Sequence, residues 1–332
     1  MQFQNVSWVD PYTNELLTEK NGFLISTTGK YQLHDGIPNF VVKLENPLQE
    51  QVQQSFGNKW TKSDFGQDDH DFEKIKNPML QMMGLSESDL SIFQNKIVLD
   101  TGIGSGSSAR LWAQKSKEFH GIDISKAVYR ARNALKSCGT KPILSQADLN
   151  ALPYLDNSFD VIVSNGVFHH TPDTKVALKN CIKKLKINGL CLFYIYKKKA
   201  PLREFADDYI RDRISDLSHD SAMKAMEPIT NFAKSLHEQS IKIQIPNDVE
   251  ILDIKKGEYD LQRFIYQFFF KCFWNESWGF EYSNLTNYDW YHPKFAWRHT
   301  KTEIQNWCSE FNLQIEYIRE TESGYTCLVK KT

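Results

Sequence analysis

A glycine-rich segment at residues 97–106, IVLDTGIGSG, constrains the fold more than any other part of the chain. Its first three residues are apolar and uncharged, as in a buried parallel strand, and an acid follows them. Gly102, Gly104 and Gly106 then alternate with other residues. Because glycine has no Cβ and adopts turns closed to other residues, such a segment brings backbone N–H groups close to a ligand at the start of a helix. We therefore predict a strand, a ligand-binding turn and a helix that starts at residue 107.

The position of the acids distinguishes two classes of nucleotide site. The dinucleotide fingerprint is G-x-G-x-x-G, whereas this chain has D-x-G-x-G-x-G, with Asp100 before the first glycine. Two later strands also end in acids, at residues 119–123 and 142–148. Asp123 is placed to accept both hydroxyls of a ribose, and Asp148 is placed to accept the amine of an adenine. The glycine spacing disfavours the alternative of an NAD enzyme; a plain helix-capping role is the alternative for Asp123.

Strands and helices alternate beyond these acids. We predict Ser125 as the N-cap of a helix through residues 127–135, because a serine there can accept from the first free N–H groups. Residues 157–165 read as a fourth strand, 173–185 as a helix and 190–196 as a fifth strand. This alternation predicts an α/β fold built on a parallel sheet.

These segments resemble, in order and spacing, the motifs of the class I S-adenosylmethionine (SAM) methyltransferases. The motifs are D-x-G-x-G-x-G, G-x-D-x-S, A-D-x-x-x-L-P, the SFDVI strand and a K-x-x-G turn, strongly over residues 95–197 and weakly over 300–330. The turn reads KING at residues 186–189 instead of the family's usual K-P-G-G, a change in a structural turn. The resemblance implies a Rossmann-like, seven-stranded, mostly parallel sheet with helices on both faces.

The resemblance also implies which residues bind SAM and its product S-adenosylhomocysteine. Asp100, Gly102 and Gly104 would surround the methionine part. Asp123 would hold the ribose, and Asp148 and Leu149 would frame the adenine. Asn165 would lie beside the methionine end or the acceptor. The full set is Asp100, Gly102, Gly104, Gly106, Asp123, Ile124, Asp148, Leu149 and Asn165.

A small β module is expected over residues 1–44, with strands at 22–26 and 29–33. The order and spacing of its strands and turns resemble those of the zinc-ribbon module attached to some methyltransferases. The positions of the four zinc-binding cysteines hold Asp10, Thr13, Ile25 and Thr28. Because these side chains cannot supply the four ligands that structural zinc needs, we expect a module without metal. The alternative is a β-hairpin arm with no ribbon ancestry.

Residues 45–94 are expected to form a helical lid and linker. Residues 45–65 read as a helix and a loop, and the F-G-x-x-W segment at 56–60 resembles one in related small-molecule methyltransferases. In those enzymes the N-terminal helix lies over the cofactor. A surface helix with one packed tryptophan is the alternative.

The core, expected over residues 95–199 and 300–332, is interrupted by an insertion at 200–299 that is too long for a simple loop. Helical apolar spacing predicts a cap with three helices, over residues 202–217, 221–236 and 257–274. The stretch 264–297 is rich in aromatic residues, which can build an apolar acceptor pocket, a core or an oligomer interface.

Two groups of residues are candidates for the chemistry on the acceptor. Methyl transfer from a sulfonium usually requires the acceptor to lose a proton, so a positioned base helps. His169 and His170 follow the fourth strand, and histidine titrates near neutral pH. Residues 287–299 are expected to be a loop that clamps the acceptor, and a structural loop and a base-free reaction are the alternatives. The candidates in this segment are Tyr291, His292, Arg298 and His299.

Charge and composition bound the remaining possibilities. The formal net charge is −1 with no long basic block, so we do not expect a nucleic-acid partner. No apolar stretch has the length of a membrane span, and residues 1–6 do not read as a signal peptide. The six cysteines are scattered without a C-x-x-C pair, as in a cytoplasmic protein with reduced thiols.

The sequence as a whole therefore predicts a cytoplasmic SAM-dependent methyltransferase, a monomer or homodimer without metal. Its acceptor would be an O or N atom, or a C atom, of a small molecule, sugar or biosynthetic intermediate. The alternatives are a protein or tRNA methyltransferase and a non-catalytic partner protein with the SAM-binding fold.

Overall fold

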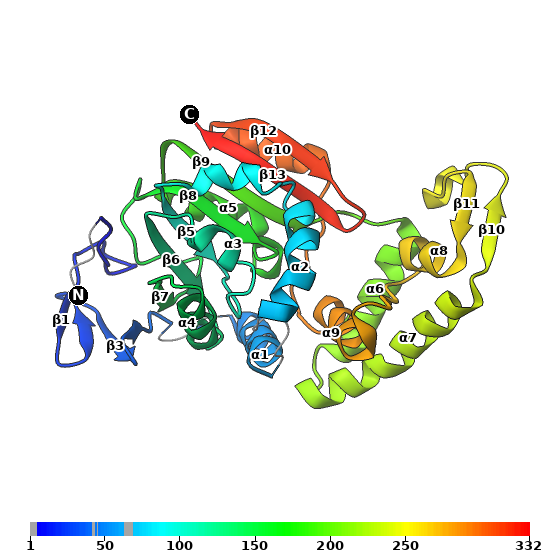
Figure 1. Cartoon of the computed structure of the whole chain (residues 1–332), viewed down its shortest axis with the longest axis horizontal. Helices are drawn as coiled ribbons and strands as arrows, with labels where there is room; N and C mark the ends of the chain where they lie inside the picture. The colour runs from blue at the N-terminus through cyan, green and yellow to red at the C-terminus, as the bar shows by residue number, and fades with distance from the viewer. Residues whose placement is uncertain (1–4, 42–43, 45, 63–68) are drawn as a thin grey trace. The chain divides into compact units, whose positions relative to one another are not determined.

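The computed structural model describes residues 5–41, 44, 46–62 and 69–332 (Figure 1). The chain divides into two compact units. The core unit comprises residues 1–196 and 299–332, and the insertion unit comprises residues 197–298. Each unit is described by itself.

The core unit is built on a seven-stranded sheet in the order β12-β13-β9-β8-β5-β6-β7. The strands are β5 (Ile97–Thr101), β6 (Glu118–Asp123), β7 (Ile143–Gln146), β8 (Phe159–Asn165), β9 (Leu185–Tyr196), β12 (Leu313–Glu320) and β13 (Gly324–Lys331). Strands β5 to β9 pair in parallel, and β13 pairs antiparallel with both β9 and β12. This arrangement confirms the predicted Rossmann-like sheet.

Apolar burial and local capping explain why these elements form. All five residues of β5 are buried, as expected for a central strand covered on both faces. The helices of the core are α3 (Arg110–Ala113), α4 (Val128–Ser137), α5 (Thr174–Lys184) and α10 (Lys301–Glu310). Asp173 caps α5 by accepting from the Val176 N–H, and Thr300 and Glu303 form a capping box on α10. Helix α5 therefore begins where the sequence predicts.

Two local predictions in the core are wrong. The helix expected from residue 107 begins at Arg110 and has a single turn, because residues 105–109 continue the glycine-rich turn. Ser125 is not the N-cap of α4, since Ala127 occupies that position. The turn expected at residues 186–189 falls inside β9 as a bulge. Phe159 pairs with Leu185 and Val161 with Leu190, so the residues of β9 between these pairs have no partner on β8, and Asn188 has φ +63°.

The N-terminal module is a four-stranded sheet in the order β1-β2-β3-β4. Its strands are β1 (Thr18–Lys20), β2 (Phe23–Ile25), β3 (Lys30–His34) and β4 (Ile37–Pro38). The buried Asp10 carboxylate accepts from the Tyr12 and Thr13 N–H groups and from the Ser26 and Tyr31 hydroxyls, at 2.9–3.1 Å. Burial opposes ionisation, but these hydrogen bonds lower the pKa of Asp10 below its usual value. A hydrogen-bonded carboxylate thus holds this loop together.

Two helices and a short 3₁₀ segment connect this module to the sheet. They are α1 (Pro47–Lys62), α2 (Asp69–Met82) and η1 (Ser88–Phe93). The helix expected within residues 45–65 matches α1, and the loop expected after it falls on residues 63–68, outside the described residues. Across the described parts of the chain, no three His, Cys, Asp or Glu side chains form a group suited to a metal ion.

The insertion unit contains four helices and a two-stranded hairpin among its described elements (Figure 1). They are α6 (Pro201–Ile214), α7 (His219–Gln239), β10 (Lys242–Ile245), η3 (Glu250–Leu252), β11 (Gly257–Asp260), α8 (Leu261–Phe268) and α9 (Gly279–Tyr291). The first two predicted helices match α6 and α7. The third predicted helix, over residues 257–274, is too long at both ends. Residues 257–260 pair with β10, Asp260 caps the start of α8, and α8 ends at Phe268.

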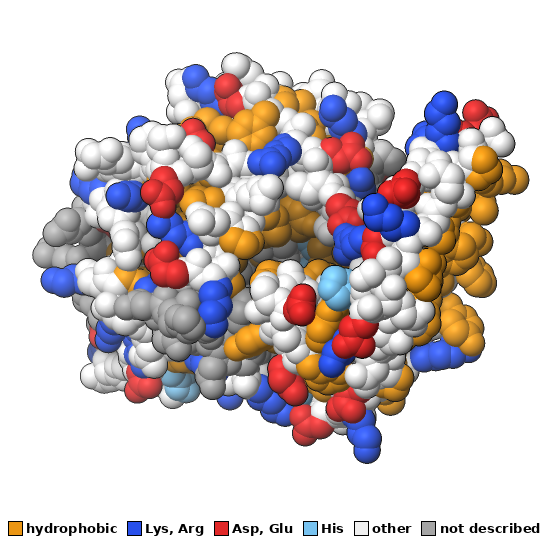
Figure 2. Space-filling model, turned by 45° about the vertical axis from the view of Figure 1, so that its right-hand side comes forward, with side chains coloured by type: hydrophobic (Ala, Val, Ile, Leu, Met, Phe, Trp, Pro, Cys, Tyr) orange, Lys and Arg blue, Asp and Glu red, His pale blue; other side chains and the backbone are white. Residues whose placement is uncertain are grey.

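The expected loop at residues 287–299 is also wrong in part, since residues 287–291 form the last part of α9. Several apolar side chains of the insertion unit reach its surface, where Figure 2 shows hydrophobic groups beside charged ones. The most exposed are Phe205 and Ile251. None of the helices in the described ranges has the length and apolar character needed to cross a membrane.

Candidate cofactor and active site

The glycine-rich turn after β5 is fixed to the neighbouring strand. The N–H groups of Gly102 and Ile103 both donate to the Ile122 carbonyl of β6, at 2.8 and 2.9 Å. Gly104 has φ +55°, and a Cβ there would lie 3.0 Å from the Trp60 indole of α1. Gly104 thus lets α1 approach the turn closely, in a conformation that disfavours other residues.

Gly106 serves the packing of the turn. It has φ +85°, and a Cβ there would lie 2.9 Å from the Cα atom of Ala131 in α4. Because this neighbour is backbone, no side-chain movement relieves the contact. The alternating glycines therefore have different roles, and that of Gly106 is to seat the turn against α4.

Asp123, the last residue of β6, lies beside this turn with its carboxylate held by fixed donors. One oxygen accepts from the Gly104 N–H at 2.9 Å. The other accepts from the Ser125 N–H at 2.8 Å and its hydroxyl at 2.6 Å. Burial raises the pKa of Asp123, and these hydrogen bonds oppose the rise. Of the about four lone-pair sites of a carboxylate, three are used, so one is open to a ribose hydroxyl, and rotation of the Ser125 hydroxyl frees a second.

Asp100, at the end of β5, is buried and accepts from the Trp112 indole N–H at 2.8 Å. Burial raises its pKa to about 8, against the effect of this hydrogen bond and with a smaller contribution from the Asp123 charge. A positive charge placed beside this buried carboxyl would stabilise its ionised form. The site therefore favours a ligand with a cationic group, as SAM has.

Helix α1 contacts the same strand ends through two glutamines. The Gln49 amide donates to the Asp148 carboxylate at 2.8 Å, and the Gln53 amide donates to the Ile124 carbonyl at 2.6 Å. A helix over the cofactor was predicted from the sequence, but these two glutamines were not. A glutamine on an amphipathic helix carries no pattern that marks it for a site, although Gln49 is buried.

The predicted cofactor residues gather at the carboxyl ends of β5, β6, β7 and β8, which are neighbours in the sheet. Asp148 is half-buried, Leu149 is buried, and Asn165 is the last residue of β8. Ligands of open α/β sheets bind at this edge, where the strand order reverses. The donors and acceptors present fit an adenosine-containing ligand.

His169 and His170 form a 3₁₀ turn, η2 (Phe168–His170), after β8. His170 places its ring 4.7 Å from that of Phe56 in α1. His169 is fully buried, its ring centroid lies 3.8 Å from that of Tyr196, and neither ring nitrogen has a hydrogen-bond partner among the described residues. Burial and neighbouring imidazoles lower the pKa of His169 well below its usual value, so this ring is neutral and enclosed.

His299 links two helix starts in the core unit. One ring nitrogen lies 2.9 Å from the Thr174 hydroxyl at the start of α5, and the ring packs edge-on against Trp307 of α10. Its backbone N–H donates to the Tyr196 carbonyl at 3.0 Å. These contacts give His299 a structural position.

Tyr291 and His292 lie in the insertion unit, where their polar atoms contact other parts of the same unit. The Tyr291 hydroxyl lies 2.7 Å from the Asp207 carboxylate and 3.0 Å from the Lys271 carbonyl. A ring nitrogen of His292 lies 3.0 Å from the Leu217 carbonyl. Burial, with the Asp207 charge, raises the pKa of Tyr291 well above its usual value. This geometry favours a structural role for both residues.

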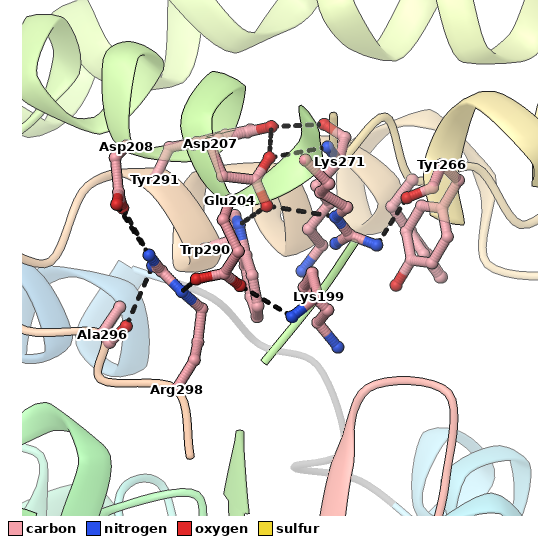
Figure 3. A network of polar contacts seen from close by, with 12 residues as sticks. Lys199, Glu204, Asp207, Asp208, Tyr266, Lys271, Trp290, Tyr291, Ala296 and Arg298 are labelled. Carbon is pink, nitrogen blue, oxygen red and sulfur yellow. Dashed lines mark hydrogen bonds and ion pairs between the residues drawn. The ribbon is translucent and has the colours of Figure 1, made fainter. Parts of the chain in front are cut away.

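Arg298 is also held within the insertion unit. Its guanidinium donates to the Glu204 carboxylate at 2.8 Å and to both Asp208 oxygens, at 2.7 and 2.8 Å (Figure 3). A further bond reaches the Ala296 carbonyl at 3.2 Å. No sequence pattern marks these carboxylates, because Arg298 lies 94 positions from Glu204 and 90 positions from Asp208 along the chain.

Comparison with known proteins agrees with the geometry of the core unit. Residues 99–193 match the family described as "Methyltransferase domain". The uncharacterized methyltransferase YcgJ of Bacillus subtilis is 28% identical over 126 residues, 37% of this chain and 49% of that protein. The phosphoethanolamine N-methyltransferase of Plasmodium falciparum is 29% identical over 131 residues, 38% of this chain and 49% of that protein.

The chain thus spans about half the length of these two curated relatives. Among solved structures, the 1,6-didemethyltoxoflavin-N1-methyltransferase of Burkholderia thailandensis aligns with a TM-score of 0.47 and 10% identity, over 93% of this chain and 97% of that one. The family match and the Rossmann-like sheet agree with the motifs in the sequence. Residues 99–193 therefore carry a methyltransferase domain, which is built on the Rossmann-like sheet.

Proposed function

We propose that the chain transfers the methyl group of SAM to an oxygen or nitrogen atom, or a carbon atom, of a small-molecule acceptor. The observation that carries this proposal is the Asp123 carboxylate, which Gly104 and Ser125 hold beside the glycine-rich turn. Asp100, Ile124 and Asp148 lie at the same edge of the sheet, at the ends of adjacent strands. When bound, SAM supplies an electrophilic methyl group on a sulfonium.

The residues of the core unit have distinct proposed roles. Asp123 binds the ribose hydroxyls, and Asp148 and Leu149 position the adenine. Asp100, Gly102 and Gly104 surround the methionine part, and Asn165 lies beside it. Helix α1 covers these groups and excludes water, through Gln49, Gln53 and Trp60.

We propose His170 as the base for an acceptor that must lose a proton. His170 follows the carboxyl end of β8, and its ring contacts α1 at Phe56. The neighbouring His169 is enclosed and neutral, which suits packing against Tyr196 rather than proton exchange. Histidine is the side chain most often used as a general base in proton transfer.

Calorimetric titration with SAM and with S-adenosylhomocysteine tests the proposal. We expect Kd values in the micromolar range, about 7–9 kcal/mol of binding free energy. The Asp123→Ala variant should bind both ligands at least about tenfold more weakly, because it loses hydrogen bonds to a charged acceptor. Asp156→Ala is the matched control, since this exposed aspartate pairs with Lys184 away from the strand ends.

Equal SAM affinity in the wild type and Asp123→Ala would contradict the ribose assignment. Binding of NADH without binding of SAM would contradict the whole proposal. The acceptor itself can be sought by incubating metabolite extracts with SAM labelled in its methyl group. Transfer of label to protein or tRNA instead would place the chain in a different substrate class.

A further inference from the structure

The N-terminal module and the edge of the central sheet border a cavity of about 580 Å³ within the core unit. The module lies beside β7, where the Phe40 N–H donates to the Gln146 carbonyl at 2.8 Å (Figure 1). Across the cavity from the module lie the start of β7 and the second half of α4. Small-molecule pockets measure about 300–1,000 Å³, so this cavity has the size of a ligand site.

Apolar side chains from four strands line the cavity. Leu24 of β2, Ile37 of β4 and Leu144 of β7 are buried. Leu33 of β3 and Ile143 of β7 are half-buried and also pack against the main apolar core. The last two therefore keep apolar surface that a guest molecule could cover, and covering such surface is favourable.

The cavity is distinct from the site predicted for SAM. On β7 it is lined by Ile143 and Leu144, in the first half of the strand, whereas Asp148 follows the end of that strand. The described residues that line the cavity include none of those predicted to bind the cofactor. A molecule bound here would therefore be a second ligand.

Two basic residues of α4 border the cavity, Arg132 and Lys136, and their i, i+4 spacing places them on one side of the helix. Arg132 has a fixed partner, because its guanidinium donates to the Asp35 carbonyl at 2.8 Å and lies 3.7 Å from the Asp35 carboxylate. The exposed Lys136 ammonium has no hydrogen bond or ion pair with a described residue. One positive charge at the rim is thus open to a ligand.

The acids at the rim limit the charge of that ligand. Asp35 pairs with Arg132, and Glu19 of β1 lies on the module side of the cavity, whereas Lys136 lies on the α4 side. A monoanion can place its charge at Lys136 and its apolar body against the strands. A dianion such as a phosphate monoester would bring a second negative charge toward these acids without a second ammonium.

We propose that this cavity binds a small monocarboxylate with an apolar body, such as a medium-chain aliphatic acid, with its carboxylate at Lys136. The aliphatic chain covers the half-buried side chains of Leu33 and Ile143, and the single charge matches the single open ammonium. The N-terminal module then has a binding role that needs no metal. This inference does not depend on methyl transfer, because it rests on a separate cavity.

Calorimetric titration of the full chain with octanoate at pH 7.5 tests the proposal. We expect a Kd of about 0.1–5 mM in the wild type. Hexanoate should bind about tenfold more weakly, because each buried methylene contributes to affinity. Lys136→Gln should weaken octanoate binding by about two- to fivefold, the effect of one exposed ion pair. Lys141→Gln is the matched control, since Lys141 is exposed, lies between α4 and β7 and does not line the cavity.

Leu33→Trp fills part of the cavity and should weaken octanoate binding by about tenfold or more. If this variant unfolds early, Ile143→Phe takes its place. Phe205→Ser, which removes an exposed apolar side chain of the insertion unit, should keep the wild-type affinity. In hydrogen exchange, octanoate should protect peptides that cover residues 17–38 and 132–144.

Three results would overturn the cavity as the site. They are octanoate affinity weaker than about 50 mM in the wild type, full affinity in the folded cavity-filling variant, and protection confined to the insertion unit. Equal affinity in the wild type and Lys136→Gln, or an equal loss in Lys141→Gln, would overturn the assignment of the carboxylate to Lys136.

Discussion

Replacing Asp207 should destabilise the insertion unit far more than replacing the adjacent Asp208. Asp207 is fully buried and accepts four hydrogen bonds, from Arg203, Trp290, Tyr291 and the Lys271 backbone, at 2.7–3.1 Å. The Asp207→Ala change leaves the Arg203 guanidinium buried without its carboxylate. Removing one partner of such a pair costs about 3–5 kcal/mol.

Asp208 provides the matched control because its chemistry is the same and its environment is not. Its side chain is 55% exposed, and its partners Arg298 and Arg211 keep other acceptors without it, the Glu204 carboxylate and the Trp290 carbonyl. Ion pairs of this kind contribute about 0–1 kcal/mol. The two adjacent aspartates should therefore differ by at least about 2 kcal/mol.

Hydrogen exchange followed by mass spectrometry is the suitable assay, because a chain with two units does not give one well-defined unfolding free energy. At about 1.4 kcal/mol for each factor of ten, Asp207→Ala should speed exchange in α8 and α9 by about two to three orders of magnitude. Peptides from β5 and β8 should exchange as in the wild type. Equal effects of Asp207→Ala and Asp208→Ala, or faster exchange in the sheet alone, would refute this account of the insertion unit.

Three further predictions concern the core unit. Burial raises the pKa of Asp100 to about 8 in the folded chain, against about 4 in the unfolded chain, so the wild type loses stability as the pH rises between these two pKa values. The unfolding midpoint of Asp100→Asn, measured relative to that of the wild type, should therefore rise between pH 5 and pH 8. A difference in midpoint that does not change with pH would contradict this. Gln49→Ala should weaken SAM binding by a factor of about two to ten, because it removes a hydrogen-bond donor to Asp148. If calorimetry shows tighter binding instead, Gln49 competes with the adenine for Asp148. If His170 is the base, His170→Gln should lower kcat by a factor of about 10²–10⁴ with little change in KM, and the pH–rate profile should lose its acid limb. An unchanged pH–rate profile would exclude His170 from proton transfer.

The core of the fold was predictable because its signals are local. A short apolar run that ends in an acid marks β5 and β6, and the glycines that follow β5 mark the turn. Asp123 and Asp148 could be assigned for the same reason, since each follows a strand directly. The parallel order of these strands then brings their ends together.

The contacts of α1 and the network of the insertion unit depend on distant partners. Gln49 reaches Asp148 across 99 positions, and Asp207 reaches Tyr291 across 84. No spacing rule connects such pairs in a single sequence. Residues 257–274 were misassigned for a different reason: aromatic residues recur there at helical spacing, but the first four complete a hairpin with β10.

Arginine carries the structural charge of the insertion unit. Its planar guanidinium bonds carboxylates and carbonyls at defined angles, and here Arg203, Arg211 and Arg298 all do so. The loss of protection in α8 and α9 expected for Asp207→Ala therefore follows from the lost geometry around Arg203 as well as from its unpaired charge, because the same guanidinium also donates to the Tyr266 carbonyl of α8.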